Sequence, residues 1–241
     1  MDVLVVGAGE MGTWFGASVD ADLAYADTDP GAAERAAETT GGRAVALDTA
    51  ERFDAVCLAV PMSVVGAAVA THAERAERAL LDLSGVMAGP VEAMREHAPD
   101  RERVSLHPLF AANAAPGRVA VVPDRPGEVT DRLRADLAER GNDLFETTGE
   151  EHDRAMRTVQ AQAHAAVLAY GLAGEPVDER FHTPVSRRLS DLVERVTDGT
   201  PRVYAEIQAT FGGAEAVAAA ADRLADADDE AFEVLYREAG R

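Results

Sequence analysis

The sequence predicts an α/β fold: a doubly wound, largely parallel sheet followed by an all-helical C-terminal domain. Two observations predict it. From residue 2 to about residue 147, short apolar runs alternate with segments of helical pattern, which is typical of a parallel sheet with crossover helices. From about residue 149 to residue 241 there are no strand-like runs, only helical periodicity broken by turn signals such as "GEP", "DGTP" and "FGG". We therefore expect two domains, residues 1–148 and residues 149–241.

The predicted strands are short apolar runs bounded by turn or helix signals. In chain order they are "VLVVG" (3–7), "DLAYA" (22–26), "AVCLAV" (55–60), "ALLDL" (79–83), "VSLHP" (104–108), "VAVVP" (119–123) and the weaker "DLFET" (143–147). Residues 30–40 and 63–76, among the intervening segments, are predicted to be helices. A long helix from about 149 to 172 opens the second domain, because Thr148 is followed by acidic residues in a first turn.

The charge of the chain is strongly negative. Forty-three acidic residues stand against 23 basic ones, so the formal net charge is −20, and every basic residue is arginine. This charge argues against a nucleic-acid partner, because the phosphates would be repelled. A solvated acidic surface suits a high-salt cytoplasm, and we expect a salt-adapted organism. A GC-rich genome would explain the missing lysines but not the excess of acid.

The chain has no feature of a membrane or secreted protein. No apolar run reaches the length of a membrane span. The N-terminus runs directly into "DVLVVGAG", without the basic flank and cleavage region of a signal peptide. The single cysteine, Cys57, excludes an internal disulfide and lies in an apolar run, as expected of a buried side chain in a reducing compartment. We expect a cytoplasmic protein with no bound metal.

A glycine-rich motif follows the first predicted strand. Gly7, Gly9 and Gly12 form G-x-G-x-x-G between a strand and a helix, the pattern of a Rossmann-type dinucleotide site whose helix N-terminus faces the pyrophosphate. Asp27 lies at the distance expected of an acceptor for a ribose 2′-hydroxyl. A 2′-phosphate would meet this carboxylate with no adjacent Arg or Lys, which predicts NAD rather than NADP. Asp29 could play the same part, but capping of the next helix is the favoured role.

Three further predicted strands end in polar or proline residues at the same edge of the sheet, where open α/β folds bind ligands. Val60-Pro61 flanks the cofactor crevice or else begins a helix. Asp82 has a functional role or caps the next helix. His107 is followed by proline, and its position beside the other strand ends favours a catalytic role over that of a satisfied buried histidine. The residues predicted to contact the dinucleotide are Gly7, Gly9, Met11, Gly12, Asp27, Val60 and Pro61.

The chain resembles the prephenate/arogenate dehydrogenase family of tyrosine biosynthesis over essentially its whole length. The resemblance rests on "GAGEMG", "AVP", "DLSGVMAGPVEAM", "HPLF", "EHDRAM" with Gln160 and His164, "TPVSR" and "TPRVYAEI". It implies NAD-dependent oxidative decarboxylation of prephenate to 4-hydroxyphenylpyruvate, with His107 as the catalytic residue. It also implies that Arg187 contacts a substrate carboxylate and that His164 faces the substrate. Gln160 lies one turn before His164 on the same face.

The chain departs from the family in the loop after residue 83. Gly85, Val86 and Met87 align where the family has Ser and then Val-Lys, so Ser84, a candidate substrate contact, is displaced by one residue. Prephenate and arogenate, which differ by an amino group, both stay open as substrates. So do two other classes: a different two-domain dehydrogenase or imine reductase, though these usually use a catalytic lysine, and a non-catalytic nucleotide sensor.

The helical domain is expected to form a homodimer. Its apolar positions are more than a small domain can easily cover alone. They include Leu189, Leu192, Val193, Val196, Val203 and Ile207.

Overall fold

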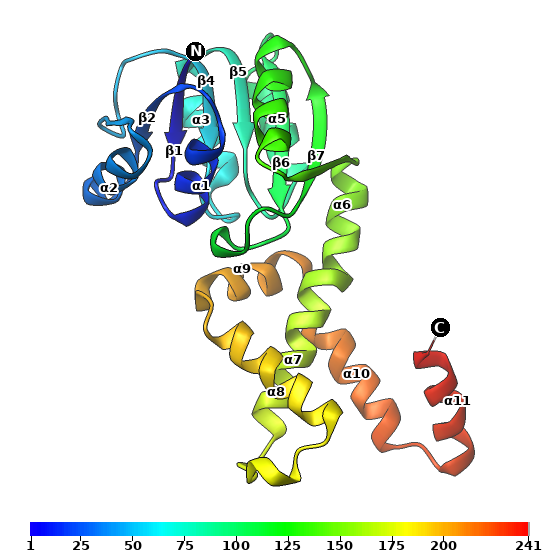
Figure 1. Cartoon of the computed structure of the whole chain (residues 1–241). Helices are drawn as coiled ribbons and strands as arrows, with labels where there is room; N and C mark the ends of the chain where they lie inside the picture. The colour runs from blue at the N-terminus through cyan, green and yellow to red at the C-terminus, as the bar shows by residue number, and fades with distance from the viewer. Residues whose placement is uncertain (241) are drawn as a thin grey trace. The chain divides into compact units, whose positions relative to one another are not determined.

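The computed structural model describes residues 1–240 and divides into two compact units, Met1–Asp153 and Arg154–Arg241 (Figure 1). The sequence places the boundary after Thr148, so Gly149 to Asp153 belong to the first unit and not, as predicted, to the second. Two residues of this short segment, His152 and Asp153, therefore lie in the same unit as the sheet.

The first unit is built on one eight-stranded sheet with the order β3-β2-β1-β4-β5-β6-β7-β8. The strands are β1 (Asp2–Val6), β2 (Asp22–Ala26), β3 (Arg43–Ala44), β4 (Phe53–Leu58), β5 (Ala76–Asp82), β6 (Glu102–Pro108), β7 (Arg118–Arg125) and β8 (Asp143–Glu146). Every pair is parallel except β6 with β7. The predicted doubly wound, largely parallel sheet is therefore confirmed, with each of the seven predicted runs in a strand.

Two features of the sheet differ from a simple alternation of strands and helices. The edge strand β3 is only two exposed residues long, so no apolar run predicts it. The antiparallel pairing of β6 with β7 follows from the short connection 109–117, which is too short for a helical crossover between parallel strands.

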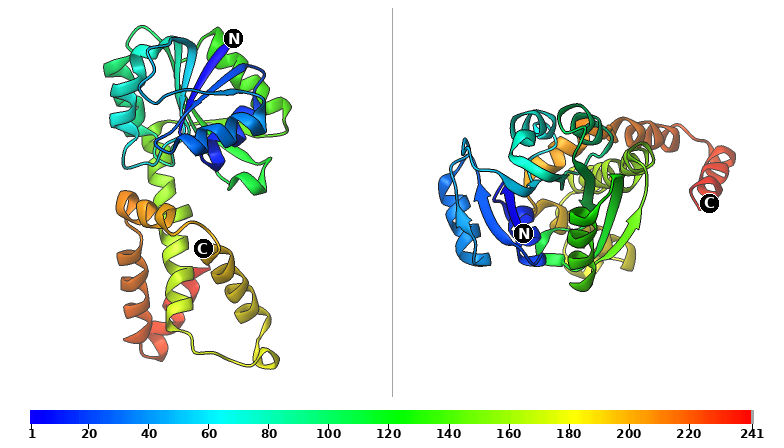
Figure 2. Two further views of the ribbon diagram at one scale, coloured as in Figure 1. Left: turned by 90° about the vertical axis from the view of Figure 1, so that its left-hand side faces the viewer. Right: turned by 90° about the horizontal axis from the view of Figure 1, so that it is seen from above.

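Helices cover both faces of this sheet, and alternate residues of each strand contact opposite layers. On one face, Val3 and Val5 of β1 pack in a cluster with side chains of α1 (Glu10–Ser18), α2 (Pro30–Thr40) and α5 (Glu128–Glu139). On the other face, Leu4 and Val6 pack with α3 (Val65–His72) and α4 (Ala88–His97). Figure 2 shows the sheet between these two groups of helices. Burial of both faces explains why the strands read as continuous apolar runs.

The second unit is helical throughout its described residues. The predicted long helix is present as three consecutive segments: α6 (Gly149–Met156), which begins in the first unit, a π-helical turn (Arg157–Gln162) and α7 (Ala163–Ala173). The helices α8 (Pro184–Thr197), α9 (Pro201–Phe211), α10 (Ala214–Ala225) and α11 (Asp229–Ala239) follow. Both α8 and α10 pack against α7. Within residues 1–240, no helix has the length and apolarity needed to cross a membrane.

Candidate functional site

The glycine-rich loop joins β1 to α1 by very close backbone approach. Gly7 has φ +96°, and a Cβ there would lie 2.3 Å from the carbonyl oxygen of Ala59. A Cβ on Gly12 would lie 2.0 Å from the carbonyl oxygen of Gly7. A Cβ on Gly9 would meet nothing within 4 Å. Gly7 and Gly12 therefore allow the turn and the packing of the helix, whereas Gly9 leaves open space at the N-terminus of α1.

Asp27 is fixed beside this loop. Its Oδ2 accepts a hydrogen bond from the Ala8 amide at 2.7 Å, and its Oδ1 accepts from the Asp29 amide at 2.9 Å. The side chain is half-buried at the end of β2, as a ribose acceptor requires. Asp29 instead caps α2, accepting from the Gly31 amide at 3.0 Å, which confirms the favoured role predicted for it.

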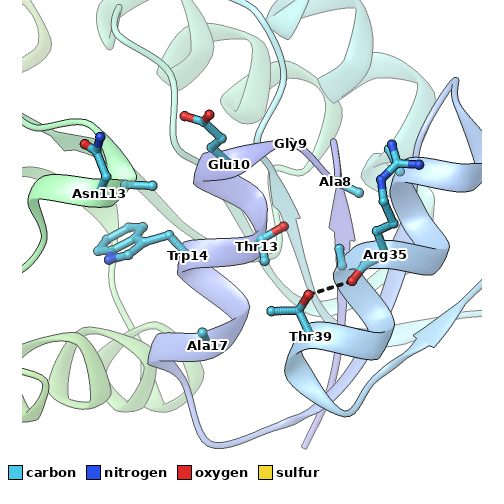
Figure 3. A pocket seen from close by; sticks show the side chains of 12 residues that line it. Ala8, Gly9, Glu10, Thr13, Trp14, Ala17, Arg35, Thr39 and Asn113 are labelled. Carbon is cyan, nitrogen blue, oxygen red and sulfur yellow. Dashed lines mark hydrogen bonds between the residues drawn. The ribbon is translucent and has the colours of Figure 1, made fainter. Parts of the chain in front are cut away.

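A cation lies closer to these carboxylates than the sequence indicates. Arg35 on α2 donates to Asp29 at 3.2 Å, because the first turns of the helix bring its side chain back to the cap. The premise that no arginine adjoins the ribose site is therefore wrong. Both partners are exposed, so the ion pair is weak. Arg35 also lines a pocket over α1 and α2, together with Gly9, Thr13 and Trp14 (Figure 3).

Residues after β4 complete the rim of this loop. Val60 packs against Gly7, because a Cβ on that glycine would lie 3.2 Å from the Val60 side chain. Pro61 opens a turn closed by the Val64 amide at 3.1 Å, and α3 starts only at Val65, so the proline does not begin the helix. Val60, Pro61 and the half-buried Met11 on α1 stay predicted cofactor contacts.

Asp82 and Ser84 close the loop after β5 upon itself. Oδ2 of the fully buried Asp82 accepts from the Ser84 amide at 3.0 Å and from the Ser84 hydroxyl at 2.6 Å. The same hydroxyl lies 2.6 Å from the Val86 carbonyl oxygen. Ser84 itself is buried, so its hydroxyl is engaged inside the protein. Ser105 on β6 is the residue paired with Asp82 of β5. Among the described residues, neither its hydroxyl nor Oδ1 of Asp82 has a hydrogen-bond partner.

Burial raises the pKa of Asp82 to about 6, against the lowering effect of the hydrogen bonds from Ser84. Because the pKa of Asp82 is higher in the folded state than its ordinary value, the contribution of Asp82 to stability is complete below about pH 4 and is lost as the pH rises through about 6.

The variant Asp82→Asn is therefore expected to be more stable than the wild type at pH 8, by an amount on the order of 3 kcal/mol, and to differ little at pH 4. The amide oxygen can still accept from Ser84, while its NH₂ group faces the Ser105 hydroxyl. Urea unfolding of the wild type and the variant at pH 4 and pH 8 measures this difference in the free energy of unfolding.

Asp124→Asn is the matched control. The pKa of Asp124 is lowered, because hydrogen bonds from Arg95 and Arg103 outweigh the raising effect of burial. This variant should therefore be less stable than the wild type at pH 8. If Asp82→Asn were destabilised equally at both pH values, the ionised Asp82 carboxylate would not be what lowers the stability of the wild type at pH 8.

His107 lies at the end of β6 in a chain of hydrogen bonds. Its Nδ1 is 2.8 Å from Nε2 of His152, and Nδ1 of His152 is 2.8 Å from Oδ1 of Asp153. The Asp153 carboxylate also accepts from the amides of Met87 and Ala88, at 3.0 and 3.1 Å, where α4 begins. All three side chains belong to the first unit. Nε2 of His107 has no hydrogen-bond partner among residues 1–240.

The environment keeps His107 neutral. Burial, and to a smaller extent the neighbouring His152, lower its pKa to about 3, although Asp153 partly opposes both effects. The pKa of His107 is low because the strand end is covered rather than open. A Cβ on Gly85 would lie 2.9 Å from Sδ of Met62 and 3.5 Å from Nε2 of His107, so the glycine allows both side chains to lie close to its backbone. A neutral imidazole with an unpaired Nε2 can accept a hydrogen bond or a proton.

Sequence reasoning assigned no role to His152 or Asp153. The two adjacent titratable residues stand at the start of a helix, where the pattern favours capping and the predicted boundary places them in the other domain. No periodicity predicts the contact of His152 with His107, which lies 45 residues earlier in the chain.

The remaining predicted site residues belong to the second unit. Gln160 lies in the π-helical turn and His164 in α7, with the His164 ring edge-on to Tyr204 at 4.8 Å. Gln160 Oε1 and His164 Nδ1 are buried and lack a hydrogen-bond partner within residues 1–240. Arg187 on α8 donates to Glu179 at 2.7 Å and is half-exposed, so it is an ion-pair partner in this structure. Their contacts with substrate stay predictions. Among the described residues, no group of His, Cys, Asp or Glu side chains could hold a metal ion.

Comparison with known proteins gives a consistent set of relatives. Residues 18–120 match the family described as prephenate dehydrogenase, nucleotide-binding domain. A 4-amino-4-deoxyprephenate dehydrogenase from Streptomyces pristinaespiralis is 32% identical over 265 residues, covering 98% of this chain and 88% of the relative.

Solved structures show the same fold at lower identity. Prephenate dehydrogenase from A. aeolicus, in complex with hydroxyphenyl propionate and NAD⁺, has a TM-score of 0.72 at 17% identity and covers 100% of this chain and 92% of its own. Synechocystis arogenate dehydrogenase has a TM-score of 0.67 at 16% identity and covers 100% and 98%.

Proposed function

The chain belongs to the prephenate dehydrogenase family, and we propose that it catalyses the NAD-dependent oxidative decarboxylation of prephenate to 4-hydroxyphenylpyruvate. The observation that carries this proposal is the unpaired Nε2 of a neutral, buried His107 at the carboxyl edge of the sheet. The glycine-rich loop and Asp27, which suit a dinucleotide, lie in the same unit. We expect a small-molecule substrate, and neither a nucleic acid nor a membrane as a partner of this acidic chain.

The residues of the loop fit NAD. Open space at Gly9 and the N-terminus of α1 suit a pyrophosphate, and the Asp27 carboxylate suits a ribose hydroxyl. When bound, NAD accepts the hydride from the carbinol carbon of the substrate. His107 accepts the proton of the hydroxyl on that carbon at Nε2. Loss of the ring carboxylate as carbon dioxide then gives the aromatic product. Arg187 would hold a carboxylate by two parallel hydrogen bonds after exchanging its partner Glu179.

A second substrate is favoured by one specific observation. The relative that is 32% identical over nearly the whole chain is named for 4-amino-4-deoxyprephenate, in which an amino group replaces the hydroxyl. The unpaired Nε2 of His107 can accept from either group. Ser84, whose hydroxyl is engaged by Asp82 and Val86, does not select between them.

One assay tests the function. Purified protein in high salt is incubated with NAD and, separately, prephenate, arogenate and 4-amino-4-deoxyprephenate, and reduced cofactor is followed. We expect turnover of prephenate with the highest kcat/KM. A higher kcat/KM for the amino compound would assign the second substrate, and binding of NAD without turnover of any of the three would contradict an enzyme.

The variant Asp27→Ala is expected to narrow the preference for NAD over NADP, because the carboxylate that binds a ribose 2′-hydroxyl repels a 2′-phosphate. The loss should lie mainly in KM for NAD. Measured kcat/KM values for both cofactors test this, with Glu38→Ala, an exposed carboxylate further along α2, as the control. Equal use of the two cofactors by the wild type, with Arg35 recruited to the phosphate, is the contrary result.

We also propose that the protein forms a homodimer through its second unit. We further propose that it acts in the cytoplasm of a salt-adapted organism. Of the apolar positions behind this proposal, Leu192 and Val203 are 41% and 50% exposed, while Ile207 is buried. Exposed Phe232 and Val234 on α11 add to the apolar surface of this unit.

A further inference from the structure

The chain of bonds from Asp153 to His107 has a fixed direction. The Asp153 carboxylate has no proton to give, since it accepts from two backbone amides and hydrogen bonds from His152 and these amides hold its pKa below the usual value despite burial. Nδ1 of His152 must therefore carry the proton that joins it to Asp153. In a neutral His152, Nε2 is then an acceptor, and only a protonated Nδ1 of His107 can bond to it at 2.8 Å.

We propose that His152 and Asp153 are positioning residues that hold His107 in its Nδ1–H tautomer and so leave Nε2 as the proton acceptor. This inference rests on the proposed function for its chemical meaning, but the tautomer itself is a property of the folded chain. Without His152, Nδ1 of His107 has no hydrogen-bond partner among the described residues, and either ring nitrogen could carry the proton.

The same hydrogen bonds, from His107 through His152 to Asp153, can stabilise the positive charge that the reaction creates. When Nε2 of His107 takes the proton from the substrate hydroxyl, the ring becomes an imidazolium in a buried place. Its Nδ1 proton can pass to Nε2 of His152, which leaves His107 neutral and puts the positive charge on His152. Nδ1–H of His152 stays bonded to the Asp153 carboxylate, so the charge ends next to its counter-ion. No proton is created or lost in this transfer.

The opposite arrangement is a distinct alternative. A doubly protonated His152 paired with Asp153 would donate from Nε2 to Nδ1 of His107, and Nε2 of His107 would then carry the proton. That state offers a donor at Nε2 of His107, where the reaction needs an acceptor. A third alternative is that Asp153 only caps α4, which requires its bonds to Met87 and Ala88 but not His152.

Side-chain ¹⁵N NMR of the whole wild-type protein, without substrate, distinguishes these states. We expect His107 to be neutral, with Nδ1 protonated and Nε2 unprotonated, between pH 6 and 9, and we expect His152 to carry a proton on Nδ1, toward Asp153. A protonated Nε2 on His107, or a doubly protonated His152, would overturn the proposal. Because no substrate is present, this result is independent of the proposed function.

Two substitutions of His152 then test the functional consequence. Glutamine can donate to Asp153 through its NH₂ group and accept from His107 through its carbonyl, so His152→Gln should keep the tautomer and most of kcat. His152→Leu should lose the defined tautomer and lower kcat at least about 10-fold, the lower end of what loss of an orienting partner costs. KM for NAD should not change in either variant.

His72→Leu is the matched control, since His72 is another buried histidine of the first unit, bonded to Arg75. It should lower the melting temperature while kcat and the His107 signals stay as in the wild type. Equal kcat in His152→Leu and His152→Gln would overturn a positioning role. The expected tautomer together with no turnover of any substrate would instead mean that the proposed function is wrong.

Discussion

Replacing His107 by Asn is expected to lower kcat by about 10²–10⁴-fold, the range for loss of a general base. The Asn amide matches the half of the imidazole that bears Nδ1 and can still donate to Nε2 of His152, which lies 2.8 Å from that nitrogen. Nothing replaces Nε2, the atom that accepts the substrate proton. The binding of NAD and the melting temperature should stay close to those of the wild type.

The pH dependence separates this role from others. A general base must be unprotonated, and burial lowers the pKa of His107 to about 3. The kcat of the wild type should therefore show no loss from His107 protonation between pH 8 and pH 5, with the acidic limb only near pH 3 to 4. A limb near pH 6.5 that disappears in the Asn variant would mean that His107 titrates as an exposed histidine does.

A purely structural histidine would behave in the opposite way. His107 is 7% exposed and bonded to His152, as a satisfied core histidine would be. On that reading, His107→Asn lowers thermal stability and leaves turnover per folded molecule intact. Melting temperature and kcat measured on one preparation distinguish the two, and a destabilised but fully active variant would show that the proposed mechanism is wrong.

The sheet was predictable because its strands are buried on both faces. Runs such as 55–60 and 104–108 contain few polar residues, and each coincides with a strand that helices cover from two sides. The edge strand Arg43–Ala44 has two exposed residues and therefore leaves no apolar pattern in the sequence. The direction of β7 is likewise absent from any apolar pattern, since it depends on the length of the preceding connection.

The candidate site was predictable where local chain geometry determines it. Gly7, Gly12 and Asp29 act through turns and caps within a few residues, or through the adjacent strand end, and their spacing is visible in the sequence. His152 and Asp153 act on residues of distant segments, at the ends of β6 and at the start of α4. Such contacts follow from how the helix start packs against the sheet, which no spacing rule contains.

The three glycines of the motif make different demands, and alanine substitutions are expected to separate them. Gly12→Ala should destabilise the fold by more than about 3 kcal/mol, because its Cβ would lie 2.0 Å from a backbone oxygen that cannot move without opening the β1–α1 turn. Gly9→Ala should cost at most about 1 kcal/mol, as the loss of a glycine N-cap. It should nevertheless weaken NAD binding strongly, since the new methyl occupies the open space that suits the pyrophosphate.

The measurements are urea unfolding and a titration with NAD followed by the fluorescence of Trp14, the single tryptophan, which lines the pocket next to Gly9. Gly66→Ala on α3 is the matched control: its Cβ also meets nothing within 4 Å, and a helical alanine should stabilise by up to about 1 kcal/mol without changing NAD affinity. If Gly12→Ala were as stable as the wild type, the close approach of α1 to β1 would not be required. If Gly9→Ala bound NAD with unchanged affinity, the pyrophosphate would have to lie away from this loop, and the dinucleotide site would need to be sought elsewhere along the sheet edge.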